Sequence, residues 1–471
     1  MASTKPEGAH LTSYEPALTG PEVADINKSS SRDEPPPGVK DDASLSPTQE
    51  DGTEINFKNL EWWQAGLVMI AETISLGILS LPSAIANIGL APGIVLILFL
   101  GILSTISGLV MGEFKRAYPW VKNFGDAGEV LGRPIGMGRF FQEFFGWAQT
   151  IFQIFVMGSH LLTWTICLNT LTDSSTCTIV WAFVGLAVFW VLNIPRTLKY
   201  TSYMSIVSFL SIFTAVLMTM IDVGIERPIG SGHIDVSRQL SFTTAFLPVT
   251  NIAVAFSGHS CFFAVMSELK KPEDWSKALA LLQICDTTIY LVAAIVIYFY
   301  VGPDVPSPAL TAAASLTLRK AIWGIAIPTI VIAGVIYGHV AAKYVFDRVF
   351  AGTVHIEKRT RWGTAGWAGI TVAVWAIALV IAESIPVFSS LLGLVCALFA
   401  SWFSYGIPGI LWLFMYKGAW FRDGKSIAMF GVNVALFLTG LTICALGLWS
   451  SATAISAETG TAAWTCKSNA G

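Results

Sequence analysis

The chain has 471 residues, of which 54% are hydrophobic and only 13% are charged, and its formal net charge is −3. A mean hydropathy of +0.63 is too apolar for an ordinary soluble domain and predicts a polytopic membrane protein. The chain has no basic patch with a nucleic-acid motif, which argues against nucleic acid as a partner.

The first 58 residues form a polar, acidic segment ahead of the first apolar run. They hold five Lys/Arg against eleven Asp/Glu and are rich in Ser, Thr and Pro. Such a composition buries too little apolar surface to fold alone, so residues 1–58 are expected to form a disordered cytoplasmic tail and not a signal peptide. Lys5, Lys28, Lys40 and Lys58 would be accessible there, so the tail is either simply solvated or a regulatory target of ubiquitin or kinase machinery.

The rest of the chain is a series of apolar runs. A helix needs about 20 mostly apolar residues to cross the hydrocarbon core of a bilayer. On that basis residues 59–450 form an all-α transmembrane domain and residues 451–471 form a C-terminal tail. The 11 predicted spans are 62–87, 92–114, 140–168, 179–195, 202–224, 243–267, 278–301, 320–345, 366–384, 387–415 and 427–449.

The Lys and Arg residues in the connections orient these spans. If the N-terminus is cytoplasmic, the inner connections hold eighteen Lys/Arg and the outer side holds five. This bias predicts a cytoplasmic N-terminus, and the odd number of spans then places the C-terminus outside the cell. Cys177 and Cys466 would both lie on the outer, disulfide-permissive side, and we expect them to pair.

The first span contains an awkward stretch at residues 75–82, Ser-Leu-Gly-Ile-Leu-Ser-Leu-Pro. Glycine loosens a helix, and proline removes a backbone donor and clashes with the preceding turn. In hydrocarbon, a broken helix survives only where it lines a cavity inside the protein. Taken alone, the stretch is either a harmless kink or one side of a binding site.

A second interruption, residues 255–260 (Ala-Phe-Ser-Gly-His-Ser), falls in the sixth span. Two interruptions five spans apart predict a 5+5 inverted repeat of the LeuT type, with helices one and six broken and a site between them. The ends of half-helices offer N–H groups to a carboxylate and carbonyl groups to an ammonium ion. The paired breaks therefore favour a zwitterionic substrate.

Residues 71–82 (Ala-Glu-Thr-Ile-Ser-Leu-Gly-Ile-Leu-Ser-Leu-Pro) resemble the first-helix signature of the amino acid/auxin permease family. Segments 156–160 (Val-Met-Gly-Ser-His), 301–310 (Val-Gly-Pro-Asp-Val-Pro-Ser-Pro-Ala-Leu) and 381–386 (Ile-Ala-Glu-Ser-Ile-Pro) are similar to its fungal neutral amino-acid permeases of the methyltryptophan-resistance type. Many relatives have Gly-x-Gly where this chain has Ser-Leu-Gly at 75–77. The resemblance covers roughly residues 58–450 and implies import of neutral amino acids, aliphatic or aromatic, across the plasma membrane, usually driven by protons.

The substrate is expected to lie between the two breaks, with further contacts from three other spans. For His259, a hydrogen bond to unwound backbone is the alternative role. The predicted substrate-binding residues are Ser75, Leu76, Gly77, Ile78, Gln153, Met157, Phe256, Ser257, Gly258, His259, Tyr337 and Phe403.

Two carboxyl groups at membrane depth, Glu72 and Asp286, are the candidates for proton coupling, because ionisable side chains are costly there. Each has a structural alternative, a bond to a neighbouring helix. Residues 333–338 of the eighth span contain no Ser or Thr that would help to bind sodium, which favours protons as the coupling ion. The seven cysteines lack metal-ligand spacing, so neither a metal nor a cofactor is expected.

Three other functions compete with transport of amino acids. An intramembrane hydrolase is disfavoured, because the Gly258-His259-Ser260 sequence lacks the second glycine of a nucleophile elbow, where Phe262 stands. A nutrient sensor that binds amino acids on a transporter fold without moving them stays open. So does a related permease for another small amine or acid, although a polyamine site would need more acidic side chains than Glu72.

Overall fold

The computed structural model describes residues 60–196, 201–227, 233–356, 360–457 and 463–469, all within the unit 56–471. The predicted tail, residues 1–58, lies outside the described residues. Regular structure in the described ranges is helical, apart from one bridge between Leu60 and Leu269. The α-helices are α1 (Trp62–Ile88), α2 (Leu90–Ala117), α3 (Phe124–Gly132), α4 (Gly138–Leu171), α5 (Thr178–Asn193), α6 (Thr201–Glu226), α7 (Phe242–Ala255), α8 (His259–Glu268), α9 (Trp275–Val301), α10 (Leu316–Val349), α11 (Arg361–Ser384), α12 (Phe388–Val395), α13 (Ile407–Met415) and α14 (Gly424–Ala457).

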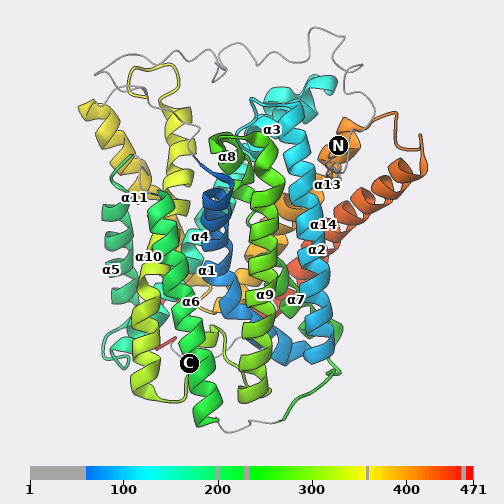
Figure 1. The fold of residues 1–471 in the computed structure, drawn as a ribbon. Helices are drawn as coiled ribbons and strands as arrows, with labels where there is room; N and C mark the ends of the chain where they lie inside the picture. Colours follow the sequence, from blue (N-terminus) through cyan, green and yellow to red (C-terminus); the bar gives the residue numbers. More distant parts are fainter. Residues whose placement is uncertain (1–59, 197–200, 228–232, 357–359, 458–462, 470–471) are drawn as a thin grey trace, which may run out of the picture. The chain divides into compact units, whose positions relative to one another are not determined.

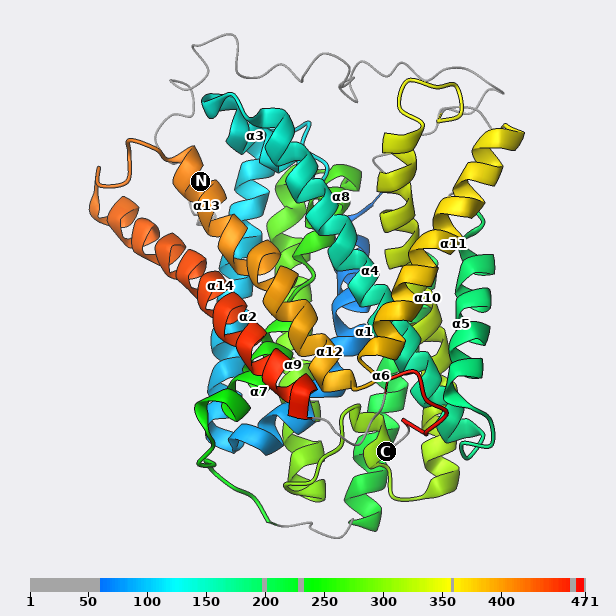
Figure 2. The same ribbon diagram turned by 180° about the vertical axis from the view of Figure 1, so that it is seen from behind.

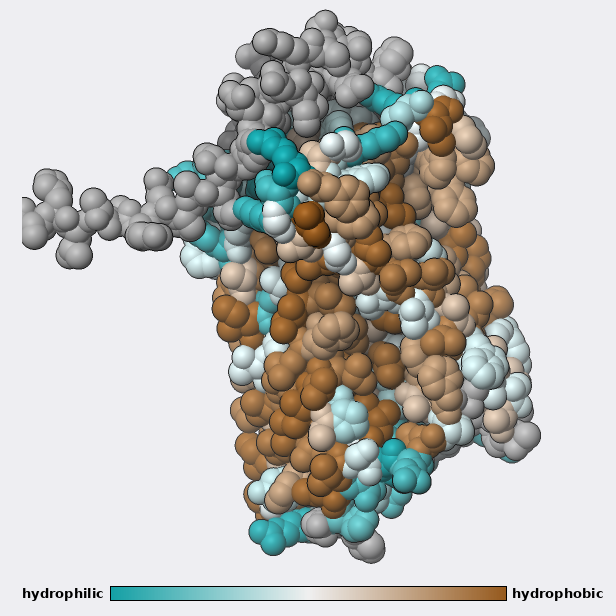
Figure 3. Space-filling model, turned by 90° about the vertical axis from the view of Figure 1, so that its right-hand side faces the viewer, coloured by the Kyte–Doolittle hydropathy of each residue, from teal (hydrophilic) through white to brown (hydrophobic). Residues whose placement is uncertain are grey.

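The apolar helices run alongside one another, while the short α3 lies across one end of them (Figure 1). Ten helical segments of the described chain are long and apolar enough to cross a membrane, and the fourth predicted span is the shorter, 16-residue α5. In Figure 3 the middle of the surface is apolar and hydrophilic residues gather at its two ends. The chain is therefore an all-α polytopic membrane protein.

The first helix is continuous, so the predicted break at residues 75–82 is wrong. Helix α1 runs from Trp62 to Ile88 with Pro82 inside it, and it packs against α6, α7 and α9. The hydroxyl of Ser80 donates to the Gly77 carbonyl at 2.9 Å within the same helix. A Cβ on Gly77 would lie 2.7 Å from Cα of Ala255, so this glycine permits a close helix crossing and does not unwind the chain.

The sixth span is interrupted where the sequence predicts it. Helix α7 ends at Ala255 and α8 begins at His259. Neighbouring helices satisfy carbonyls that the interruption frees, as buried backbone groups require. The Tyr290 hydroxyl donates to the Ala255 carbonyl at 2.9 Å, and the Ser104 hydroxyl donates to the Phe256 carbonyl at 3.3 Å. These bonds keep the interruption in one defined conformation.

The tenth predicted span departs from a regular α-helix. Two π-helical turns, Cys396–Ala400 and Trp402–Gly406, join α12 to α13. Such wide turns are rare and occur frequently near functional sites. Val395 lies immediately before the first of them, so the departure from regular geometry begins beside the central cavity described below.

The C-terminal segment returns to the bundle at the start of α5 (Figure 2). Helix α14 continues to Ala457, eight residues past the predicted end of the last span, because small helix-compatible residues extend it. A disulfide joins Cys177 to Cys466. The Thr178 hydroxyl donates to the Lys467 carbonyl at 2.8 Å, and the Asn469 side chain donates to the Thr165 hydroxyl at 2.9 Å.

Candidate substrate-binding site

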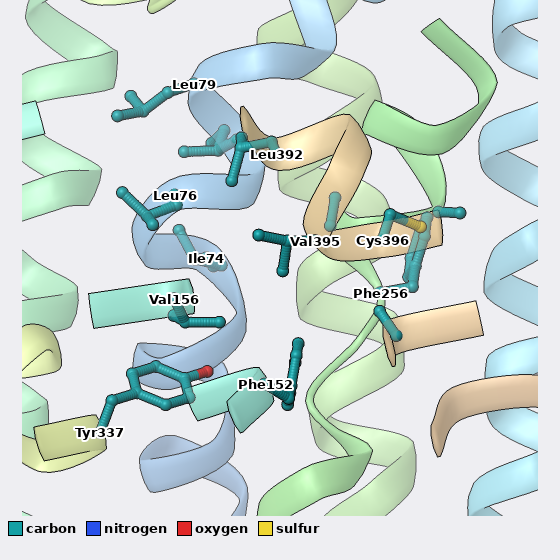
Figure 4. Packing of buried hydrophobic residues seen from close by; sticks show 14 of the residues in the cluster. Ile74, Leu76, Leu79, Phe152, Val156, Phe256, Tyr337, Leu392, Val395 and Cys396 are labelled. Atoms are coloured by element: carbon teal, nitrogen blue, oxygen red, sulfur yellow. The ribbon is translucent and has the colours of Figure 1, made fainter. Parts of the chain in front are cut away.

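A cavity lies between α1 and the α7–α8 interruption, and we call it the central cavity. The space in it that no atoms fill amounts to about 420 Å³, part of which is open to solvent. Figure 4 shows side chains from α1, α4, α10 and α12 approaching a common space. Its lining residues are Glu72, Thr73, Ser75, Leu76, Gly77, Phe152, Val156, His160, Val254, Ser257, Gly258, Tyr337, Leu392 and Val395.

Half of the predicted substrate contacts line this cavity. They come from the middle of α1, from the interruption and from α10. A Cβ on Gly258 would lie 2.4 Å from Cγ2 of Thr73, so the interruption touches α1 directly at the cavity wall. The predicted residues brought together are Ser75, Leu76, Gly77, Ser257, Gly258 and Tyr337.

The other six predicted contacts, Ile78, Gln153, Met157, Phe256, His259 and Phe403, lie outside the cavity lining. The fully buried His259 ring instead contacts the Ser107 hydroxyl at 2.7 Å, which attaches the interruption to α2. The Phe256 ring packs edge-on against Tyr290, and Phe403 packs against Phe124 and Phe152.

On α4 the cavity lining consists of residues with the predicted spacing, each one position before the predicted residue. Phe152 and Val156 line the cavity, whereas Gln153 and Met157 are buried among neighbouring helices. One residue corresponds to a rotation of about 100° around a helix. Hydrophobic periodicity could not distinguish the two faces, because α4 is buried on most of its surface.

His160, one turn beyond Val156, also lines the cavity. Its side chain is fully buried, and its ring lies 6.0 Å from that of Tyr337. Neither ring nitrogen makes a hydrogen bond of normal geometry in the described structure, although the backbone of Ile330 is close. Because buried polar atoms are usually paired, the lack of a normal hydrogen bond makes His160 a candidate ligand contact.

Of the two predicted coupling residues, Glu72 faces the cavity directly. It is partly exposed to the cavity space, and its carboxyl group interacts with the side chains of Tyr337 on α10 and Cys261 on α8. Asp286 on α9 is not part of the lining of the central cavity. Its Oδ2 accepts a 2.6 Å hydrogen bond from Thr73, and its Oδ1 has no partner among the described residues. Asp286 therefore reaches the site through Thr73.

The central cavity has two chemically different sides. Phe152, Val156, Leu392 and Val395 from α4 and α12 form an apolar wall. Hydroxyl groups and the Glu72 carboxyl group approach from α1, α10 and the interruption. Among the described residues there is no cluster of His, Cys, Asp or Glu that could hold a metal ion.

A largely buried cavity of this kind, set at a helix interruption inside a bundle of spanning helices, defines a membrane protein that handles small solutes. Residues 58–453 match the family model described as transmembrane amino acid transporter protein, and the chain belongs to that family. It is therefore a multi-pass membrane transporter and not an enzyme.

Similar proteins span nearly the whole chain. The N amino acid transport system protein of Neurospora crassa is 33% identical over 404 residues, which cover 84% of this chain and 85% of that protein. A transmembrane transporter of Gibberella moniliformis is 27% identical over 439 residues, 90% of each chain. The structure of Mhp1, a nucleobase-cation-symport-1 family transporter in a closed conformation with bromovinylhydantoin bound, gives a TM-score of 0.49 at 13% identity, over 88% of this chain and 96% of that chain.

Proposed function

We propose that this chain imports neutral amino acids, aliphatic and aromatic, across the plasma membrane by proton symport. The observation that carries this proposal is the central cavity, which joins a helix interruption to an apolar wall. The substrate carboxylate would lie at the N-terminus of α8, where helix N–H groups lack partners within the helix. The ammonium group would lie toward the carbonyl end of α7, and the side chain would pack on Phe152, Val156, Leu392 and Val395.

The family supports an amino acid as substrate, and the name of the Neurospora relative is consistent with it. We assign the chain to the methyltryptophan-resistance type on the motifs at residues 156–160, 301–310 and 381–386. Proton coupling rests on Glu72, a carboxyl group at the cavity and at membrane depth, with Asp286 as a second protonatable group behind Thr73.

The proposed architecture is a LeuT-type 5+5 repeat of 11 spans that works by alternating access. The N-terminus would be cytoplasmic, with modification of its tail as the regulatory input, and the C-terminus would be extracellular. Only the sixth span is interrupted in the described structure, so the proposed alternation moves α7 and α8 against a continuous α1.

Reconstituted proteoliposomes provide the test. Labelled amino acid should accumulate under an inward proton gradient, and a panel of twenty amino acids should compete in the order of their fit to the apolar wall. Binding without accumulation would identify a sensor on a transporter fold. Accumulation of a polyamine or an auxin-like acid in preference to amino acids would assign a different substrate.

A further inference from the structure

Glu72 also borders a second cavity. The space in this second cavity that no atoms fill amounts to about 280 Å³, part of it open to solvent, and its walls come from α1, α6 and α10. Glu72 is the one residue that lines both it and the central cavity, within the described part of the chain. The lining residues of the second cavity are Val68, Ala71, Glu72, Ser205, Ser208, Ala333 and Ile336.

The second cavity lies on the side of Glu72 toward the end of the bundle where α1 and α6 begin. Val68 is six residues into α1 and Ser205 is four residues into α6. At about 1.5 Å per residue, these positions are about 9 and 6 Å from the helix ends, whereas Glu72 is about 15 Å from the start of α1. The cavity therefore covers part of the distance between Glu72 and that end of the bundle.

Two hydroxyl groups and the Glu72 side chain supply the polar groups of the second cavity, whose other lining residues are apolar. Ser208 shares a 2.9 Å hydrogen bond with Thr329. Ser205 is 1% exposed, and its hydroxyl makes no hydrogen bond to the described part of the protein. A buried hydroxyl without a protein partner is normally satisfied by water, and the cavity has room for at least one water molecule.

The other titratable groups around Glu72 do not line the second cavity. Tyr337 from α10 and Cys261 from α8 interact with the carboxyl group, and His160 from α4 lines the central cavity. Asp286 from α9 contacts Thr73, the next residue along α1. Helix α6 presents only the two serines to the second cavity, so within the described lining Glu72 is its sole titratable group.

We propose that the second cavity holds water and, through Ser205 and Ser208, forms the route by which the proton carried on Glu72 leaves toward the end where α1 and α6 begin. This inference rests on the proposed proton symport. In the step, the Glu72 O–H bond breaks and its proton passes to a cavity water held by Ser205, while that water hands on one of its own protons. Glu72 becomes a carboxylate, and no other bond changes.

An isosteric pair of substitutions tests the route. Ser205→Val and Ser205→Thr add nearly the same volume, but only the threonine keeps the hydroxyl group. Two assays in proteoliposomes distinguish proton release from substrate movement. The first measures uptake driven by a proton gradient, with an internal pH-sensitive dye. The second measures exchange of labelled for unlabelled substrate at equal pH. Ser211→Ala is the matched control, because Ser211 lies on the same helix, outside the second cavity, and bonds the Ile325 carbonyl.

We expect Ser205→Val to reduce proton-driven uptake and dye acidification by about tenfold while exchange is maintained, and Ser205→Thr to behave like the wild type. Equal proton-driven uptake in Ser205→Val and Ser205→Thr would overturn the route while leaving proton symport intact. Wild-type protein that accumulates substrate on a sodium gradient and not on a proton gradient would refute the proposed function and the route together.

Discussion

Gly258 and Thr73 face each other so closely that a Cβ on the glycine would lie 2.4 Å from Cγ2 of the threonine. This is the point where the interruption between α7 and α8 touches the continuous helix α1. The Thr73 hydroxyl donates a 2.6 Å hydrogen bond to Asp286, which fixes the orientation of the Thr73 side chain. Two contacts therefore fix the position of this part of the cavity wall. One is the steric fit between Gly258 and Thr73, and the other is the buried hydrogen bond between Thr73 and Asp286.

Replacing Gly258 with alanine should strongly reduce transport, because the new methyl group would clash with the Thr73 side chain. Thr73 cannot rotate away without breaking its hydrogen bond to Asp286. Overpacking of this kind typically costs about 1–3 kcal/mol. The double variant Gly258→Ala/Thr73→Ser should recover activity, because serine lacks Cγ2 but keeps the hydroxyl that donates to Asp286. Gly324→Ala, with no atom within 4 Å of the added methyl group, is the control. If the double variant transports no faster than Gly258→Ala, this account is contradicted.

Gly77→Val should abolish transport by reconstituted protein while the variant still folds. The added side chain would push α1 away from the Ala255 backbone and from the Tyr290 hydroxyl, which lie 2.7 and 3.3 Å from a Cβ at this position. The measurement is uptake by proteoliposomes, normalised to the amount of folded protein that they contain. Wild-type uptake would show that the close crossing of α1 and α7 is not required for function.

Glu72→Gln should uncouple substrate movement from the proton gradient. Glutamine keeps the shape and polarity of the side chain but carries no exchangeable charge, so exchange should persist and proton-driven accumulation should disappear. Glu143→Gln is the control, because Glu143 pairs with Arg348 and is 46% exposed. Unchanged accumulation in Glu72→Gln would remove this residue from the coupling mechanism.

His160→Phe should raise the KM of transported amino acids by about tenfold with little effect on stability. The phenyl ring is flat and aromatic like imidazole, although larger, and has no nitrogens; a lost hydrogen bond to substrate costs about 1–3 kcal/mol. Met157→Leu, on the same helix but outside the cavity lining, should leave KM unchanged. If His160→Phe lowers the thermal midpoint and leaves KM unaltered, its role is packing.

Removing the disulfide by Cys177→Ser/Cys466→Ser should lower stability, since the bridge closes a loop across a sequence separation of 289 residues. Native disulfides typically contribute about 2–4 kcal/mol. Thermal unfolding in detergent measures the effect, and Cys444→Ser, at a free cysteine, is the control. Equal midpoints for all three proteins would show that the hydrogen bonds of Lys467 and Asn469 suffice to hold the tail.

The spanning helices were predictable from the sequence, because a bilayer demands long apolar segments whatever the details of packing. The interruption after Ala255 was predictable because Ser257 and Gly258 stand together inside such a segment. The break in α1 was not, since the same residue types also serve close helix packing. Gly77 takes the second role, and only the position of Ala255 on another helix decides between them.

The cavity was predictable from the sequence only in part. Residues of α1 and of the interruption carry local signals that mark them. The face of α4 that meets the cavity depends on how the helix is rotated in the bundle, so Phe152 and Val156 were missed by one position. The contributions of Leu392 and Val395 depend on α12, which leads into two π-helical turns, and no local pattern predicted those turns.

Because Glu72 lines two cavities, the size of its side chain affects whether water could pass continuously through the protein. A transporter must never connect the two sides of the membrane through a continuous column of water, and here one side chain contributes to both water-accessible spaces. Shortening it would enlarge both spaces at the same point. The residue proposed to carry the proton thus also helps to keep the membrane sealed, which makes its length as important as its charge.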